Sequence, residues 1–238
     1  MPNLQKKAAF STELAYLLGL IAIAIGVAFM EKADFGVSMV VAPAYVLYRA
    51  ISPTLPFFTF GMAEYVLQAV LLIVLCILLG RVRLADLFSF VTAVLYGFML
   101  DGAMLAVRLI PFDHIAVRLG GYAFGMVLCA LGVSLVFHTY IAPEVYELFV
   151  KRLSEKYRIP IHRFKTCYDC ISCLAALAMS FLFFGFGQFV GVQLGTIVCA
   201  LVNGSLIGLF SRVLESRFRF VDRFPMRPFF EGETAKTP

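Results

Sequence analysis

Residues 60–80, FGMAEYVLQAVLLIVLCILLG, decide the fold class of this chain. The segment is long enough to cross a bilayer as an α-helix, because about 20 apolar residues span the hydrocarbon core. Two polar residues, Glu64 and Gln68, lie four positions apart in it and therefore share one face of the helix. An ionisable group inside a membrane span is costly, so Glu64 is a candidate functional residue by default.

The composition of the whole chain agrees with a membrane protein. Of its 238 residues, 61% are hydrophobic and 15% are charged, whereas a soluble domain has about 25% charged residues. The basic N-terminus and first apolar run resemble a signal peptide, but the run is too long and lacks a small-residue cleavage site. We therefore predict one all-α, polytopic membrane domain over residues 1–238 with the lipid bilayer as its environment. Its six expected spans are residues 14–30, 60–80, 87–107, 120–140, 166–186 and 196–214.

Three other segments are too short or too polar to span. Residues 37–51 are interrupted by Pro43 and are expected to form a half-helix that lies in the interface or re-enters the membrane. Residues 143–165 are polar with a 3.6-residue apolar period, which predicts an amphipathic helix on the cytoplasmic membrane surface. Residues 215–238 are expected to form a loosely ordered cytoplasmic tail.

The basic residues are distributed unequally between the two sides that six spans create. Of the 20 Lys and Arg, 16 fall on the side of both termini and four on the other. Positive residues concentrate on the cytoplasmic side, so we predict a bacterial inner-membrane protein with both termini in the cytoplasm. The net charge of +5 is then a topology signal, and no nucleic-acid partner is expected.

The two halves of the chain echo one another. The glycine pair of the first span, Gly19 and Gly26, recurs 106 residues later in the fourth span as Gly125 and Gly132. Glu64 is matched 105 residues later by Asp169, and residues 96–97 are matched at 107 by Asn203 and its neighbour. Because three spans is an odd number, a second copy must be inverted in the bilayer. We therefore predict two inverted three-span repeats, residues 14–110 and 120–214, with a site near the midplane.

Three stretches carry a family resemblance: ADFGVSMVVAPAYVLYRAISPTLPFFTFGMAEYVLQAVLL (33–72), LFSFVTAVLYGFMLD (87–101) and VQLGTIVCALVNGSLIGLFSR (192–212). Through them the chain resembles the YczE/YyaS/YitT-type bacterial integral membrane proteins, most of all the YczE-like branch. The resemblance covers most of residues 14–212 and implies a six-span membrane protein of undetermined substrate. It also implies that Asp101 and Asp169 stand where such proteins carry an acid.

Four acidic or amide side chains are candidates for a substrate or ion site, together with a mid-span Asn. Glu64 with Gln68 is either a proton or cation carrier or a substrate ligand near the outer end of its span, or an acid at the interface that is hydrogen-bonded or hydrated. Asp101 either faces Glu64 across the bundle or is a structural acid paired with Arg108. Asp169 is a candidate through its match to Glu64.

The remaining polar features have structural alternatives. Asn203 is either a ligand or part of a close helix contact. Cys167, Cys170 and Cys173 form a stripe on one helix, but closed metal sites take four ligands, so we expect packing residues and no metal. The glycine-rich residues 185–196 either present backbone N–H groups to a substrate or form a tight hairpin. No pattern typical of a soluble enzyme occurs, so neither catalysis nor a cofactor is expected.

Taken with the spans, these residues favour a small secondary transporter of a small polar solute, coupled to protons through Glu64, Asp101 or Asp169. One alternative is the substrate-binding subunit of an energy-coupled vitamin uptake system, in which Ala24 and Ala28 would form a close contact with a partner helix. Another is a non-transporting regulator or scaffold. A homodimer is left open.

Overall fold

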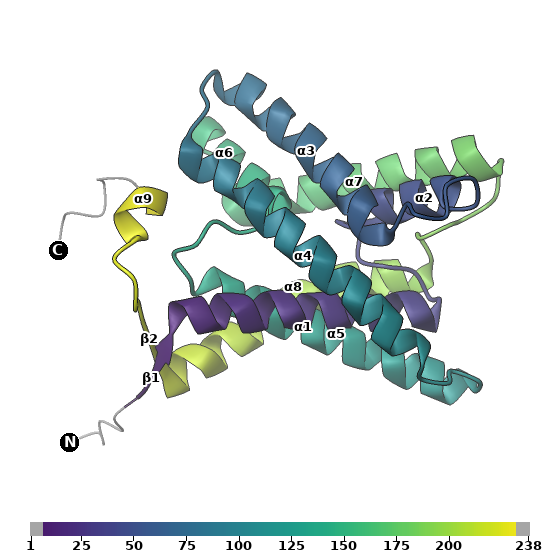
Figure 1. Cartoon of the computed structure of the whole chain (residues 1–238), viewed down its shortest axis with the longest axis horizontal. Helices are drawn as coiled ribbons and strands as arrows, with labels where there is room; N and C mark the ends of the chain where they lie inside the picture. Colours follow the sequence, from purple (N-terminus) through teal and green to yellow (C-terminus); the bar gives the residue numbers. More distant parts are fainter. Residues whose placement is uncertain (1–6, 232–238) are drawn as a thin grey trace.

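The computed structural model of the chain describes residues 7–231, and these are mainly helical (Figure 1). Within them, six helices are long and apolar enough to cross a membrane, which confirms the predicted all-α, polytopic membrane fold. These helices are α1 (Thr12–Ala33), α3 (Phe60–Leu79), α4 (Leu84–Arg108), α5 (Ile115–Phe137), α7 (Ile161–Phe184) and α8 (Leu194–Arg217). The shorter elements are β1 (Ala8–Ser11), α2 (Ala42–Ile51), α6 (Val145–Tyr157), β2 (Phe218–Val221) and α9 (Arg227–Glu231).

Local sequence sets the ends of the first helices. The hydroxyl of Ser11 accepts a hydrogen bond from the Leu14 N–H at the start of α1, and Thr59 caps α3 in the same way. Helix α3 ends at Gly80, whose φ of 66° lies in the left-handed region that glycine adopts without a steric cost. The polar signals that punctuate the apolar segments therefore coincide with the helix boundaries.

The helices form two groups on either side of a central space (Figure 1). In one group, α1 and α5 pack along each other, α4 packs on α1, and α8 packs on α5. In the other group, the short helices α2 and α6 each pack against both α3 and α7. Helix α4 links the groups because it also packs against α3. Each half of the chain therefore contains one long helix, one short helix and two more long helices, in that order: α1 to α4 in the first half and α5 to α8 in the second.

Glycines bring α1 and α5 into close contact. A Cβ atom added to Gly26 would lie 2.6 Å from the carbonyl oxygen of Gly125, and one added to Gly125 would lie 2.6 Å from that of Gly26. Gly19 and Gly132 are related in the same reciprocal way. Small residues at a helix crossing allow the backbones this close, as is common in membrane bundles.

The amphipathic residues of α6 are covered by protein. Val145, Leu148 and Leu153 are buried in a cluster that includes Leu72 and Leu75 of α3. The apolar face of this segment was expected to rest on the membrane surface, and the difference arises because α3 and α7 cover that face instead. Helix α2, expected to be interfacial or re-entrant, is likewise packed against two long helices.

The C-terminal segment is more ordered over residues 218–231 than expected. Strand β2 pairs in parallel with β1, so that Ala8 lies opposite Phe218. The Glu13 carboxylate accepts hydrogen bonds of 3.0 Å from the backbone N–H groups of Arg223 and Phe224. The N-terminal segment therefore supplies the partners that hold this part of the tail, while residues 232–238 lie outside the described residues.

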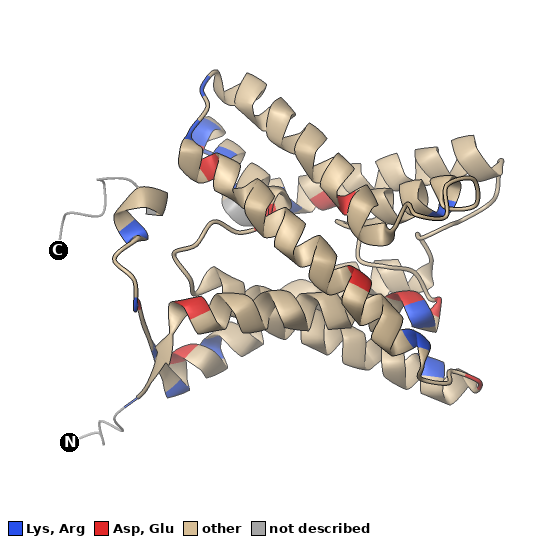
Figure 2. Cartoon of the chain, in the orientation of Figure 1, with Lys and Arg blue, Asp and Glu red and all other residues tan. Residues whose placement is uncertain are grey.

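Charged side chains gather at the two ends of the bundle and are sparse along the middle of its long helices (Figure 2). This is the distribution that an apolar membrane interior imposes on charged groups. The inside-positive orientation of the chain stays a prediction. Lys6 and Lys236, which contribute to it, lie outside the described residues.

Candidate functional site

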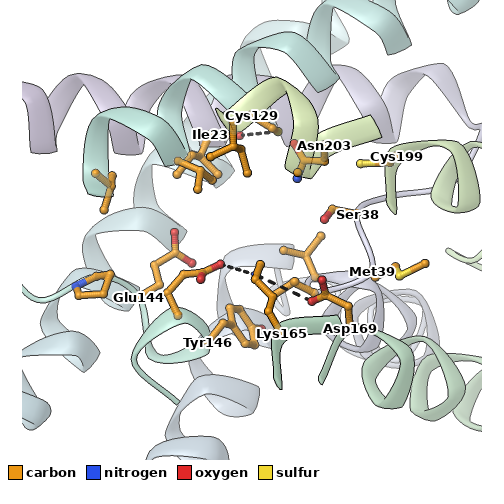
Figure 3. A pocket seen from close by; sticks show the side chains of 18 of the residues that line it. Ile23, Ser38, Met39, Cys129, Glu144, Tyr146, Lys165, Asp169, Cys199 and Asn203 are labelled. Carbon is orange, nitrogen blue, oxygen red and sulfur yellow. Dashed lines mark hydrogen bonds and ion pairs between the residues drawn. The ribbon is translucent and has the colours of Figure 1, made fainter. Parts of the chain in front are cut away.

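A cavity of about 320 Å³ lies between the two groups of helices. Figure 3 shows Glu144, Tyr146, Lys165 and Asp169 on one side of it, and Cys129 and Asn203 on the other. Apolar side chains make up most of the remaining wall, among them Ile23, Val27, Val133, Val136 and Ile207. The volume is at the lower end of the range that small-molecule sites occupy, about 300–1,000 Å³.

Both short helices begin at this cavity. Residues 38–41, which lead into α2, line it, and so do Glu144 and Tyr146 at the start of α6. The N-terminus of a helix carries a partial positive charge and backbone N–H groups that lack partners within the helix. Two such ends therefore meet the cavity from opposite halves of the chain.

Polar groups on the α7 side of the cavity form a charged cluster. The Lys165 ammonium lies 2.8 Å from a Glu147 carboxylate oxygen and 3.9 Å from Oδ1 of Asp169. Among the described residues, that Oδ1 atom has no hydrogen-bond partner, and neither has the Tyr96 hydroxyl or the Asn203 Oδ1. Tyr96 is fully buried and is one of the lining residues, so α4 also contributes a polar side chain to the wall.

A buried carboxylate pair adjoins the cavity. The Tyr146 hydroxyl donates a hydrogen bond of 2.7 Å to Oε2 of Glu64. The Gln68 amide nitrogen lies 3.3 Å from a carboxylate oxygen of Glu64 and 3.3 Å from one of Glu144, and its amide oxygen accepts from the Val145 N–H at 3.0 Å. Gln68 therefore bridges two acids that come from different halves of the chain.

Burial dominates the electrostatics of this pair. Burial raises the pKa of Glu144 well above its ordinary value, and the neighbouring Glu64 acts in the same direction. Glu64 is fully buried, and within residues 7–231 its Oε1 atom has no hydrogen-bond partner. Two carboxyl groups this close in a low-dielectric site favour holding a proton between them.

Asp101 has a different environment from the other predicted acids. Its Oδ1 accepts a hydrogen bond of 2.9 Å from the Gly61 N–H, and its Oδ2 accepts one of 2.7 Å from the Thr59 hydroxyl. It therefore caps the N-terminus of α3 from α4, and it is not among the described residues that line the cavity. The ion pair with Arg108, the structural alternative for Asp101, is also not found within residues 7–231.

The structure thus brings together Glu64 with Gln68, and separately Asp169 with Asn203 across the cavity, while Asp101 stays apart. The sequence analysis missed Glu144, Tyr146 and Lys165, because they fall in a segment that was assigned to a polar surface insertion. The residue pair before Glu144, Ala142-Pro143, marks the start of a helix. The sequence analysis used only the apolar period of residues 143–165, which predicted a helix there but not its packing against α3 and α7.

The cysteines of α7 and the alanine pair of α1, which the sequence analysis singled out, are not among the described residues that line the cavity. Cys167 and Cys170 were expected to be packing residues but are exposed on α7, so that prediction is wrong for them, whereas Cys173 is half-buried. Ala24 and Ala28 are buried inside the chain, so the face that was considered for a partner helix is already covered.

The glycine-rich link, residues 185–196, bonds to another segment of the chain. The Val37 N–H donates to the Gly191 carbonyl at 3.1 Å, and the Gly195 N–H donates to the Phe35 carbonyl at 2.9 Å. The link borders a second, smaller hollow of about 130 Å³, next to Glu31 and Arg49.

Comparison with known proteins gives a family without an assigned activity. No curated protein and no solved structure matches the chain. A family model described as a family of unknown function, DUF6198, matches residues 10–212. Because the match covers most of the chain, this six-helix membrane protein belongs to the DUF6198 family.

Proposed function

We propose that the chain is a small secondary transporter of a small polar solute, with the central cavity as its substrate site and the Glu64–Glu144 pair as its proton site. The observation that carries this proposal is the position of the buried carboxylate pair. It lies directly beside a ligand-sized cavity at which both short helices begin. Discontinuous helices that end at a central site are a recurring feature of transporters.

The proposal includes an inverted repeat. Gly19 corresponds to Gly125 in the repeat, and Gly26 corresponds to Gly132. A two-fold axis between α1 and α5 requires that Gly19 meet Gly132 whenever Gly26 meets Gly125, and both contacts are present. The two helices are antiparallel, so such an axis would lie across them, in the membrane plane if both span. The shared order of long and short helices supports the same relation.

The two halves differ in one helix pair, which supports alternating access. Helices α3 and α4 pack together, whereas α7 and α8, their counterparts, are not among the described helix pairs that pack. They lie in different groups, on opposite sides of the cavity (Figures 1 and 3). If α7 and α8 came together while α3 and α4 separated, the route to the cavity between α7 and α8 would close. A route between α3 and α4 would open in its place.

Proton coupling would follow from competition within the carboxylate pair. When both Glu64 and Glu144 lack a proton, their repulsion in a buried site is strong, so one proton is held. The charged and titratable groups around the pair are Tyr146, Glu147, Lys165, Tyr96, Tyr16, Cys129 and Tyr168. Only Lys165 is cationic, and Glu147 already engages it. Movement of a substrate next to Glu144 would therefore change how tightly the proton is held.

The location we propose is the bacterial inner membrane with both termini in the cytoplasm, on the strength of the basic asymmetry. The resemblance to the YczE-like branch is compatible with that location. In this orientation α6 runs from the cavity toward the cytoplasmic loop between α3 and α4, where Lys156 contacts the Leu78 carbonyl.

The test is uptake by purified protein in proteoliposomes. With a proton gradient imposed, a mixture of small polar metabolites is supplied outside and the contents are analysed by mass spectrometry. We expect accumulation of a solute that depends on the gradient and is lost in Glu64→Gln and Glu144→Gln. Glu155→Gln is the control, because Glu155 lies on α6 with an exposed side chain. Gradient-dependent uptake that is unchanged in both variants would contradict the proposed mechanism.

A further inference from the structure

We infer that the central cavity binds a small organic cation that donates hydrogen bonds, such as a primary ammonium or an amidinium, attached to a compact apolar body. This inference rests on the proposed function in one respect, that the cavity is the substrate site. It goes further by assigning the chemical class of the substrate from the charges and unused acceptors of the cavity wall.

The charge balance of the wall favours a cation. Glu144, Glu147 and Asp169 line the cavity, and Lys165 is the one Lys or Arg among the described lining residues. The Lys165 ammonium is already 2.8 Å from Glu147. If Glu144 holds a proton, two carboxylates still face one ammonium. The charged side chains of the wall therefore have a net negative charge, and their single cation is engaged; the N-termini of α2 and α6 add partial positive charge.

The unused hydrogen-bonding atoms point to a donor. Within residues 7–231, Asp169 Oδ1, Tyr96 Oη and Asn203 Oδ1 are buried atoms without a hydrogen-bond partner. A buried acceptor without a hydrogen-bond partner is destabilising, and more so if it is charged. The two carbonyl-type acceptors, Asp169 Oδ1 on α7 and Asn203 Oδ1 on α8, lie on opposite sides of the cavity (Figure 3), whereas the Tyr96 hydroxyl on α4 can donate or accept. A ligand with several N–H groups therefore matches the acceptors of both sides. A solute that only accepts hydrogen bonds would leave Asp169 Oδ1 without a hydrogen bond among the described residues, with only its 3.9 Å ion pair to Lys165.

The apolar part of the cavity wall determines which ligand body fits beside the charged head group. Its aliphatic side chains come from α1, α5, α8 and the residues before α2, and include Ile23, Val133 and Ile207. Apolar surface of this kind is stabilised by contact with an apolar ligand at about 25 cal/mol per Å² of area removed from water. The volume of about 320 Å³ limits the ligand to a compact molecule. A metal ion or a bare ammonium would leave this apolar wall unused.

The test compares four probes of one shape that differ in their head group. Cyclohexylammonium, cyclohexanol, cyclohexanecarboxylate and cyclohexyltrimethylammonium are titrated calorimetrically into the full chain in detergent. We expect cyclohexylammonium to bind about tenfold more tightly than the alcohol, a difference of about 1.4 kcal/mol. The quaternary probe should be weaker than the primary one because it has no N–H donor, and the carboxylate should not bind.

A variant assigns the binding to the cavity. Asp169→Asn keeps the shape of the side chain but removes its charge, so the affinity for cyclohexylammonium should fall about tenfold. Asp113→Asn, in the exposed link between α4 and α5, is the matched control and should bind as the unaltered chain does. The comparison of probes on the unaltered chain does not depend on how the variants fold.

The outcomes separate this inference from the proposed transport. Equal or tighter binding of the carboxylate, absence of binding by all four probes, or an unchanged affinity in Asp169→Asn would overturn the cation assignment. Uptake of an anion by proteoliposomes would overturn it too, while leaving a carrier in place. Binding of the ammonium probe as expected, without any transport of cations, would support the assignment and contradict the carrier.

Discussion

The close contact between α1 and α5 makes a sharp prediction about alanine substitutions on one helix. Gly120 and Gly125 both lie in α5, but a Cβ atom on Gly120 would meet no atom within 4 Å. A Cβ atom on Gly125 would lie 2.6 Å from the Gly26 carbonyl oxygen, 3.0 Å from Met30 Cγ and 3.1 Å from Phe29 Cβ. The same substitution, Gly to Ala, therefore has opposite expected effects five residues apart.

The magnitudes follow from these distances. Ala is preferred over Gly in a helix by about 0.5–1 kcal/mol, so Gly120→Ala should be more stable than the unaltered chain by that amount. In Gly125→Ala the shortest distance must grow from 2.6 Å to the 3.4 Å of an ordinary contact, so the helices must separate by about 0.8 Å. Overpacking of this kind costs about 1–3 kcal/mol. The free energies of unfolding of the two variants should therefore differ by about 1–3 kcal/mol.

The assay is reversible unfolding of the detergent-solubilised protein by sodium dodecyl sulfate, followed by circular dichroism. Gly26→Ala should cost about as much as Gly125→Ala, because the contact is reciprocal. The double variant should cost less than the sum of the two, since one separation of the helices accommodates both methyl groups. If Gly125→Ala proved as stable as Gly120→Ala, the proposed packing of α1 on α5 would be refuted.

Three further predictions concern charged residues. Burial raises the pKa of Glu144, so the folded state holds a proton that the unfolded state releases above its ordinary pKa of about 4.3, and stability is lost as pH rises. Glu144→Gln should therefore be more stable than the unaltered chain at pH 8, by about 1.4 kcal/mol for each unit of pKa shift, and thermal unfolding should show this advantage shrinking toward pH 5. Asp86→Asn should lower the free energy of unfolding by about 3 kcal/mol, because its carboxylate lies 2.7 Å from the Arg152 guanidinium and is buried; a loss below about 1 kcal/mol would place this pair among surface ion pairs. In a cysteine-free background, Asp113→Cys should react with an impermeant thiol reagent from outside the cell and Glu155→Cys only after permeabilisation, and the reverse pattern would invert the proposed orientation.

The six spans could be predicted from the sequence because a bilayer imposes both a length and an apolar composition on each helix. Glu64 could be identified for the same reason, since an acid stands out within an apolar segment. Asp101 gives the same signal but caps α3, so the sequence alone does not separate a capping acid from a binding acid.

Glu144 illustrates the opposite limit. It follows Pro143 in a segment that also carries Glu147 and Lys151, and it is half-buried because α6 packs against α3 and α7. Residues 143–165 have the same amphipathic period whether lipid or neighbouring helices cover the apolar face. The part of the site contributed by α6 was therefore beyond what periodicity can reveal.

The pairing of β1 with β2 has a consequence for the biosynthesis of the chain. Ala8 is synthesised 210 residues before its partner Phe218. At about 5–20 residues per second, the N-terminal strand waits roughly 10–40 s for its partner. Throughout that interval its edge, and the Glu13 carboxylate that later receives the Arg223 and Phe224 N–H groups, remain open to chaperones and proteases. A chain that ends before residue 218 lacks β2, so the edge of β1 stays unpaired. Chaperones and proteases that bind unpaired strands could then recognise the truncated chain.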